Sequence, residues 1–159
     1  MTCIQRLHHA AYRCRDSEET RGFYEDFLGL QLINALAIGS TKSGRSANVL
    51  HTFYAMDDGS CLAFFEAPDE PFDFKQQHDF DLHIALQVDS ETLLDMFEKG
   101  RQAGTETRGI ADHGFIDSIY FRDPNGYVLE LSAPKEDEPM RDVVAANDIL
   151  KSWQDSKIL

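Results

Sequence analysis

The most informative pattern of apolar and polar positions lies near the end of the chain, in residues 118–131 (SIYFRDPNGYVLEL). Residues 118–122 and 127–131 have the two-residue period that predicts strands. The DPNG segment between them combines the fixed φ of proline with the positive φ that Asn-Gly tolerates, so it predicts a tight turn. In the second strand, Glu130 lies on the face opposite the bulkier side chains. This carboxylate either faces water or, if it is buried, needs a cation or hydrogen-bond donors beside it.

Two further predicted strands each carry a histidine on one face. Residues 82–88 (LHIALQV) have four aliphatic side chains on one face and His83 on the other. Residues 7–14 (LHHAAYRC) have His8 and His9 on opposite faces. One of these residues alone is more often structural than a metal ligand. Together, however, His9, His83 and Glu130 offer two imidazoles and a carboxylate, a set that suits a divalent first-row metal ion.

The order of predicted elements repeats along the chain. The first half is expected to contain a strand, a helix and three strands, at residues 4–14, 20–28, 30–38, 49–56 and 61–67. The second half has the same order, at residues 82–88, 92–102, 106–109, 118–122 and 127–132. His9 and His83 occupy equivalent positions in the opening strands, and an Asp-Ser helix start follows each strand. We therefore expect an α+β fold with two βαβββ modules in a domain spanning 1–134, the modules covering about 4–67 and 82–134.

The last segment, residues 135–159, lies outside the repeat. It begins with a charged linker and continues into a predicted helix at 142–153, whose apolar residues fall on or near one stripe. We expect this C-terminal helix to dock, either on its own chain or on a partner.

Composition and charge exclude several classes of partner. The chain has 159 residues, enough for one domain or for two small repeats that share a core. A net charge of −13 argues against nucleic acid or an anionic membrane as partner. The three cysteines have no ligand-like spacing, which predicts a reducing compartment. Without a membrane-length apolar run or a signal-peptide core, a cytoplasmic location is expected.

Three segments, taken in order, resemble the vicinal oxygen chelate superfamily of glyoxalases, epimerases, extradiol dioxygenases and antibiotic-resistance proteins. They are HHAAYRCRDSEETRGFYEDFLGL, LHIALQVDS and YFRDPNGYVLEL, and the resemblance covers about residues 4–134. It implies two βαβββ modules whose curled mixed sheets enclose a metal ion, with His9, His83 and Glu130 at the ligand positions. It also implies a homodimer, because in several members the site is shared between two subunits.

The segment from His113 to Glu130 resembles the signature of extradiol ring-cleaving dioxygenases, in which a His and a Tyr stand beside the iron. The resemblance implies Fe(II) and catalytic roles for His113, which would move protons, and Tyr120, which would donate to a phenolate oxygen. Ala111 departs from the signature. His113 is alternatively a loop residue with only local hydrogen bonds. His51, in the strand at 49–56, is a candidate for pocket lining alone.

A glyoxalase-like lyase, epimerase or isomerase is the alternative reaction class, and Mn, Ni and Zn are the alternative metals. In that class a fourth protein ligand usually comes from the end of the first module, near Glu66. Glu66 and Ala63 lie on opposite strand faces, and either one matches the fourth position. If Ala63 matches it, the site has three ligands and the dioxygenase is favoured. A third possibility is a metal-free resistance protein that binds a small molecule.

Overall fold

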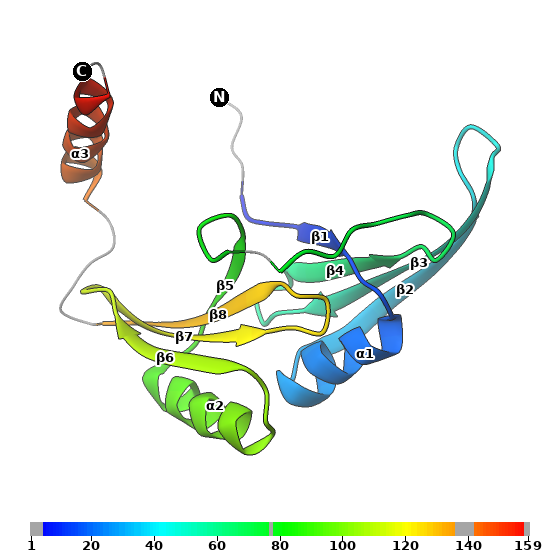
Figure 1. The fold of residues 1–159 in the computed structure, drawn as a ribbon, viewed down its shortest axis with the longest axis horizontal. Helices are drawn as coiled ribbons and strands as arrows, with labels where there is room; N and C mark the ends of the chain where they lie inside the picture. The colour runs from blue at the N-terminus through cyan, green and yellow to red at the C-terminus, as the bar shows by residue number, and fades with distance from the viewer. Residues whose placement is uncertain (1–4, 77, 136–141, 158–159) are drawn as a thin grey trace. The chain divides into compact units, whose positions relative to one another are not determined.

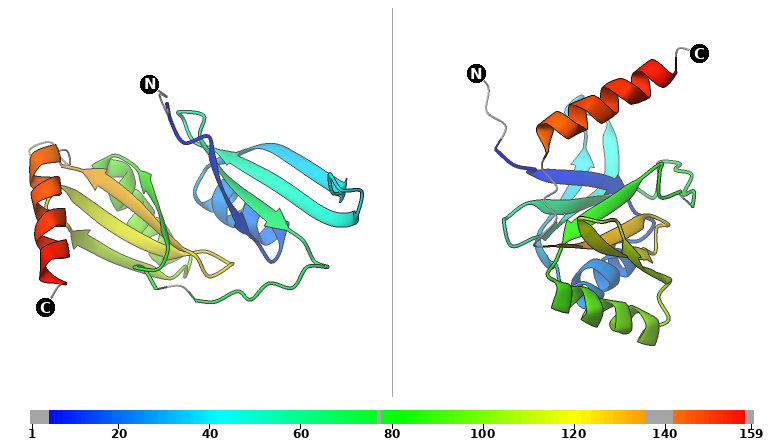
Figure 2. Two further views of the ribbon diagram at one scale, coloured as in Figure 1. Left: turned by 90° about the horizontal axis from the view of Figure 1, so that it is seen from above. Right: turned by 90° about the vertical axis from the view of Figure 1, so that its left-hand side faces the viewer.

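In a computed structural model, which describes residues 5–76, 78–135 and 142–157, the strands form two four-stranded sheets (Figure 1). The first module contains β1 (His9–Arg13), α1 (Ser17–Arg21), the π-helical turn η1 (Gly22–Phe27), β2 (Gln31–Ser40), β3 (Ser46–Ala55) and β4 (Cys61–Glu66). The second contains β5 (His83–Gln87), α2 (Ser90–Gln102), β6 (Thr107–Asp112), β7 (Ile116–Arg122) and β8 (Val128–Pro134). This element order confirms the predicted βαβββ modules and the α+β class. Figure 2 shows each sheet from two further directions.

The strands have the same spatial order in both sheets, β1-β4-β3-β2 in the first and β5-β8-β7-β6 in the second. In the first sheet β1 runs parallel to β4, and β3 is antiparallel to both β4 and β2. In the second sheet β6 and β7 are antiparallel. The opening strand of each module is therefore an edge strand next to the module's last strand.

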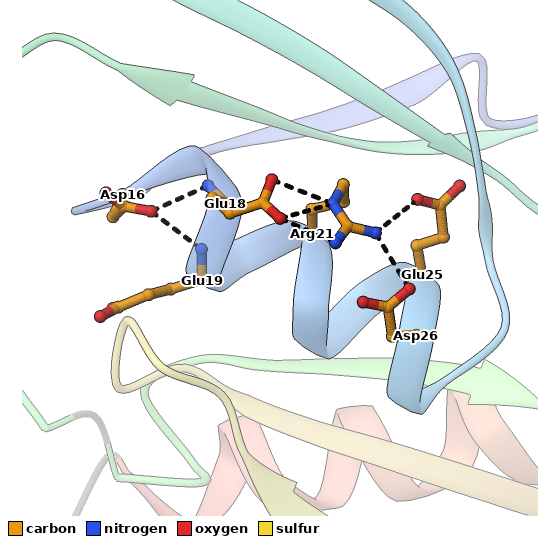
Figure 3. Close-up of polar contacts among 6 residues, drawn as sticks. All are labelled: Asp16, Glu18, Glu19, Arg21, Glu25 and Asp26. Atoms are coloured by element: carbon orange, nitrogen blue, oxygen red, sulfur yellow. Dashed lines mark hydrogen bonds and ion pairs between the residues drawn. The ribbon is translucent and has the colours of Figure 1, made fainter.

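Local sequence signals account for the start of the first helix. The carboxylate of Asp16 accepts hydrogen bonds of 2.8 Å from the backbone N–H groups of Glu18 and Glu19, which caps α1 (Figure 3). Arg21 then forms ion pairs with the carboxylates of Glu18, Glu25 and Asp26 (Figure 3). Arg21 and Glu25 are about one-third exposed, and Glu18 and Asp26 are more exposed, so each pair stabilises the helix only modestly.

The helical segment packs on one face of the first sheet. Tyr24 is fully buried, with its ring centroid 4.6 Å from that of Phe64 and 5.8 Å from that of Tyr54. Phe64 and Tyr54 alternate with Ala63 and Phe53, which therefore point to the opposite face of the sheet. The helix thus covers the face opposite to the one that carries His9.

Helix α2 packs closely on the second sheet. A side chain at Gly100 would meet Thr107 Oγ1 at 2.4 Å and the Phe121 ring at 2.5 Å, so only glycine allows this approach. Ile119 and Phe121 are buried on this face, whereas Ser118 and Tyr120 point to the other one. As in the first module, one face of the sheet is left for polar chemistry.

The chain divides into two compact units that do not coincide with the two halves of the sequence. The first unit extends to His83 and also includes Arg122–Val128, and the second consists of Ile84–Phe121 and the chain from Leu129 onward. The DPNG turn therefore belongs to the first unit, although most of β7 and most of β8 belong to the second. Asn125 in this turn accepts a hydrogen bond of 2.9 Å from the backbone N–H of Arg15.

The C-terminal helix α3 (Val143–Ser156) confirms the predicted helix, and Asp142 caps it by accepting a hydrogen bond from Ala145 N. Its apolar side chains are exposed, including Val143, Ile149 and Trp153. Nothing in the described parts of the chain buries them, so docking on a partner remains a prediction. Most of the predicted linker before it, residues 136–141, lies outside the described residues. Over residues 5–76, 78–135 and 142–157, none of the helices has the length and apolarity needed to cross a membrane.

Candidate active site

The strand register gives His9 defined neighbours on one face of the first sheet. β1 pairs with β4 so that His9 lies opposite Cys61 and Ala11 opposite Ala63. β3 pairs with β4 so that Phe53 lies opposite Ala63. Paired residues in adjacent strands point to the same face. His9, Ala63 and Phe53 therefore share one face.

The His9 ring contacts two other histidines. Its Nδ1 lies 2.7 Å from Nδ1 of His8, and its ring centroid lies 5.5 Å from that of Phe53 and 6.2 Å from that of His51. The alternation rule put His8 on the opposite face, but β1 begins at His9, so strand alternation does not apply to His8. If His9 Nδ1–H is the donor in this contact, Nε2 is the nitrogen left to bind a metal.

His51, which the sequence offered as a candidate for pocket lining alone, lies near His9 on the first sheet. It is 7% exposed and stacks on Phe65 at 3.6 Å between ring centroids. Its Nδ1 lies 3.0 Å from the carbonyl oxygen of Phe64, and a carbonyl only accepts, so Nδ1–H is the donor. In the neutral ring, Nε2 is then a proton acceptor on the His9 face. The available signal was that His51 has the same strand parity as Phe53.

His83 makes a backbone hydrogen bond of a kind that metal-binding imidazoles often make. Its Nδ1 donates to the backbone carbonyl oxygen of Asp79 at 2.7 Å. Histidine ligands commonly make such a bond, because it fixes the tautomer and directs the other nitrogen to the metal. This contact is consistent with Nε2 of His83 as a ligand atom.

Glu130 is buried at 5% exposure, and two hydroxyl groups donate hydrogen bonds to it. Ser118 Oγ donates to Oε1 at 2.6 Å, and Ser132 Oγ donates to the same oxygen at 2.8 Å. The sequence left open whether the Glu130 face meets water or is buried with donors, and the second alternative is confirmed. Hydroxyls that hold one carboxylate oxygen are typical of a carboxylate ligand with a supporting outer shell.

His113 and Tyr120 lie together in the second unit. His113 Nε2 and Tyr120 Oη are 2.8 Å apart, and the ring planes are perpendicular. Tyr120 has the same strand parity as Ser118, whose hydroxyl donates to Glu130. Tyr120, Ser118 and Glu130 therefore share a face of the second sheet. The resemblance-based pairing of His113 with Tyr120 thus corresponds to a direct contact.

The segment that carries His113 is held by its neighbour Asp112. The Asp112 carboxylate accepts a hydrogen bond of 2.7 Å from Gly114 N and lies 2.7 Å from Lys135 Nζ. Lys135 and the Gly114 N–H hold the pKa of Asp112 below its ordinary value. At neutral pH the charged carboxylate of Asp112 therefore holds the turn that carries His113 in place.

Glu66 makes a different kind of contact. It lies three residues beyond Ala63 on β4, so strand parity puts it on the helix-covered face, opposite the His9 face. Its Oε2 accepts a hydrogen bond of 2.7 Å from the backbone N–H of Ser17, at the start of α1. Ala63 is the β4 residue that shares a face with His9. A role for Glu66 as a metal ligand remains a prediction that this contact does not favour.

The three candidate ligands are distributed over both units, with His9 and His83 in the first and Glu130 in the second. Among the residues that the structure describes, no three His, Cys, Asp or Glu side chains are grouped so that they could hold a metal ion. The local contacts nevertheless fit a divalent metal, because a carbonyl orients His83 and hydroxyls orient Glu130. Convergence of the three on one ion remains a prediction.

Sequence comparison identifies the family. The profile described as the Glyoxalase/Bleomycin resistance protein/Dioxygenase superfamily matches residues 6–131, and the chain therefore belongs to this superfamily. A comparison with curated proteins finds no match.

Solved structures with the same fold include several members of this superfamily. The fosfomycin resistance protein FosX from Listeria monocytogenes has a TM-score of 0.65 and 21% identity, over 85% of this chain and 98% of that one. A glyoxalase/dioxygenase from Nostoc punctiforme has a TM-score of 0.63 and 23% identity, over 83% and 92% of the two chains. A domain from Frankia sp. EAN1pec, described as glyoxylase/bleomycin resistance protein/dioxygenase, has a TM-score of 0.65 and 20% identity, over 84% and 100%.

Proposed function

We propose that this protein is a metal-dependent, ring-cleaving dioxygenase that acts on a catechol, a small substrate with two neighbouring oxygen atoms. The observation that carries the proposal is the 2.8 Å contact between His113 and Tyr120, on the sheet face shared with Ser118, the partner of Glu130. A hydroxyl and an imidazole in direct contact can pass a proton between a substrate oxygen and the protein. Superfamily membership supports metal-dependent enzyme activity in general.

Three residues are proposed to hold the metal, namely His9, His83 and Glu130. Fe(II) is the proposed ion because two imidazoles and one carboxylate suit it, and when bound it supplies the reactivity with O₂ that opening an aromatic ring requires. A structure of FosX contains Mn(II) and 1S,2S-dihydroxypropylphosphonic acid, which supports a divalent metal and a small oxygen-rich ligand in this fold.

The protein groups then divide the proton chemistry. Tyr120 hydrogen-bonds a substrate oxygen, and His113 accepts or returns the proton that Tyr120 exchanges with that oxygen.

A glyoxalase-like lyase, epimerase or isomerase is the second candidate, and the family match includes such enzymes. The version that uses Glu66 as a fourth ligand is disfavoured by the bond between Glu66 and Ser17 N. A metal-free small-molecule binding protein is the third candidate. The contacts that orient His83 and Glu130 count against it, because they are typical of metal ligands.

The test begins with protein purified without added metal, whose metal content is measured. O₂ uptake by the iron-loaded protein is then recorded with a panel of catechols. We expect uptake with at least one catechol, and a fall of about 10²-fold in turnover for His113→Ala while metal content stays unchanged. His78→Ala is the matched control, because His78 is an exposed histidine outside the proposed site. No O₂ uptake with any catechol, or equal turnover in His113→Ala, would favour the lyase.

We also infer that the protein is a homodimer, as the superfamily resemblance implies. Small-angle scattering at working concentration measures the mass directly. A monomer of 18.0 kDa under these conditions would contradict this inference.

A further inference from the structure

A cationic side chain lies directly beside Tyr120 on the second sheet. The register of β6 and β7 pairs Arg108 with Tyr120, and the Arg108 guanidinium carbon lies 5.4 Å from the centroid of the Tyr120 ring. Because paired residues share a face, Arg108 belongs to the face that carries Tyr120 and Ser118. Neither the sequence pattern nor the proposed proton chemistry gives Arg108 a role.

The backbone next to Arg108 is built in an unusual way. The β6–β7 register shifts between Gly109 and Ala111, and Gly109 has a φ of +111°. A Cβ at Gly109 would lie 2.7 Å from the carbonyl oxygen of Ser118, so glycine is required here on two grounds. β-Bulges commonly re-aim side chains beside functional sites. This bulge fixes the strand immediately after Arg108.

The guanidinium of Arg108 has the chemistry that an anionic group requires. Its Nε lies 3.6 Å from Glu106 Oε1, and both side chains are more than two-fifths exposed, so this ion pair is weak. A guanidinium has five N–H donors in a planar fork that matches the two oxygens of a carboxylate. In a chain of net charge −13, an anionic ligand gains no general attraction and needs a specific local cation.

We propose that Arg108 is a specificity-determining residue that binds an anionic group, a carboxylate, on the aromatic substrate whose oxygen hydrogen-bonds Tyr120. Arg108 and Tyr120 lie opposite each other on neighbouring strands, so one aromatic ligand on this face can meet both side chains. The substrate class is then a catechol that carries a carboxylate. This inference rests on the proposed function, because Tyr120 is taken to contact the substrate.

The test compares a charged ligand with its uncharged isostere. Binding of 3,4-dihydroxybenzoate and 3,4-dihydroxybenzamide to the metal-loaded protein is measured by anaerobic titration calorimetry, so that no ring is cleaved. We expect the wild type to bind the benzoate more tightly, and Arg108→Gln to weaken benzoate binding about tenfold while benzamide binding is unchanged. Arg108→Lys should restore part of the difference, because it keeps the charge but not the planar fork.

Arg101→Gln is the matched control, because Arg101 also lies near a carboxylate and over an aromatic ring, but on α2. It should leave both affinities unchanged. The proposal would be overturned if Arg108→Gln weakened the affinity for both ligands equally, or left the ratio of the two affinities unchanged. It would also be overturned if the wild type did not bind the benzoate. If neither compound causes O₂ uptake but Arg108→Gln still removes the preference for the benzoate, the dioxygenase fails and the anion site stands.

Discussion

The hydroxyl group of Tyr24 donates a hydrogen bond of 3.1 Å to the carboxylate of Asp123, which lies 99 residues further along the chain. Both side chains are buried. Asp123 also accepts hydrogen bonds from the backbone N–H groups of Asn125 and Tyr127, at 2.9 and 2.8 Å. The carboxylate of Asp123 thereby links the turn between β7 and β8 to η1 of the first module.

Loss of the Tyr24 hydroxyl should destabilise the first unit. In Tyr24→Phe the ring packing is kept, but the buried Asp123 carboxylate loses a donor, and we expect the free energy of unfolding to fall by about 1–3 kcal/mol. Denaturant titration followed by circular dichroism measures this change. Tyr12→Phe is the control, since Tyr12 makes ring contacts with Phe64 and Tyr127 and should tolerate the loss of its hydroxyl. Equal stability of Tyr24→Phe and the wild type would contradict the assignment.

Stability should depend on pH through Asp123. Burial raises the pKa of Asp123 above its ordinary value of 3.8, and hydrogen bonds from Asn125, Tyr127 and Tyr24 offset this only in part. The folded protein therefore binds more protons at Asp123 than the unfolded chain does, in the interval between the two pKa values. In this interval the contribution of Asp123 to the free energy of unfolding falls as pH rises.

Asp123→Asn removes this titration and provides the measurement. The free energy of unfolding of the wild type minus that of Asp123→Asn should decrease as pH rises from 3.8. It should become constant once pH exceeds the pKa in the folded protein. A difference that rises with pH over this range would mean that the hydrogen bonds outweigh burial.

The bulge in β6 should not tolerate a side chain at Gly109. In Gly109→Ala the positive φ costs about 1–2 kcal/mol, and contact with the Ser118 carbonyl oxygen adds to this cost. Gly104→Ala separates the two terms, because Gly104 also has a positive φ, of +69°, but a Cβ there would meet no atom within 4 Å among the described residues. We expect thermal unfolding to be lowered more in Gly109→Ala than in Gly104→Ala. Equal effects would mean that the close contact is relieved without cost.

Removal of any proposed ligand should remove the metal. His9→Ala, His83→Ala and Glu130→Gln should each contain far less bound metal than the wild type after identical purification. Ser118→Ala should lower metal affinity by about 10- to 100-fold, because Ser118 orients Glu130. Metal analysis of the purified proteins measures both effects, with His78→Ala as control. Full metal content in the Glu130→Gln protein would exclude Glu130 as a ligand.

Glu66 offers a contrasting outcome. Because its carboxylate accepts a hydrogen bond from Ser17 N, Glu66→Ala should weaken the start of α1 and lower the unfolding temperature. Metal content should be unchanged. Loss of metal in Glu66→Ala, with the helix intact by circular dichroism, would instead make Glu66 a fourth ligand and favour the lyase.

Much of the fold could be predicted from local pattern. The period of two in the strands and the Asp-Ser helix starts correspond to structure, since Asp16 and Asp89 cap helices that begin at Ser17 and Ser90. Strand ends were less accurate. β6 continues to Asp112, beyond the predicted residue 109. Element ends depend on hydrogen bonds to distant strands, which a local pattern does not contain.

The candidate site was predicted unevenly for the same reason. Strand parity and the family resemblance selected Glu130, His113 and Tyr120 as candidates, but the burial of Glu130 and the contact of His113 with Tyr120 were left open. The importance of His51 was not apparent, because its tautomer depends on the carbonyl oxygen of Phe64 in another strand. Arg108 was missed because the bulge at Gly109 is a property of the β6–β7 pairing and not of the β6 sequence.

The assignment of Arg122–Val128 to the first unit has a consequence for attempts to divide the protein. A gene cut in the connector between β4 and β5 would yield two fragments with the same order of elements, neither of which encodes a whole unit. The amino-terminal fragment would keep Tyr24 and Thr20 but lack Asp123 and Asn125, their hydrogen-bond partners. The two modules therefore cannot be separated at this connector, and we expect each fragment to fold only when both are expressed together.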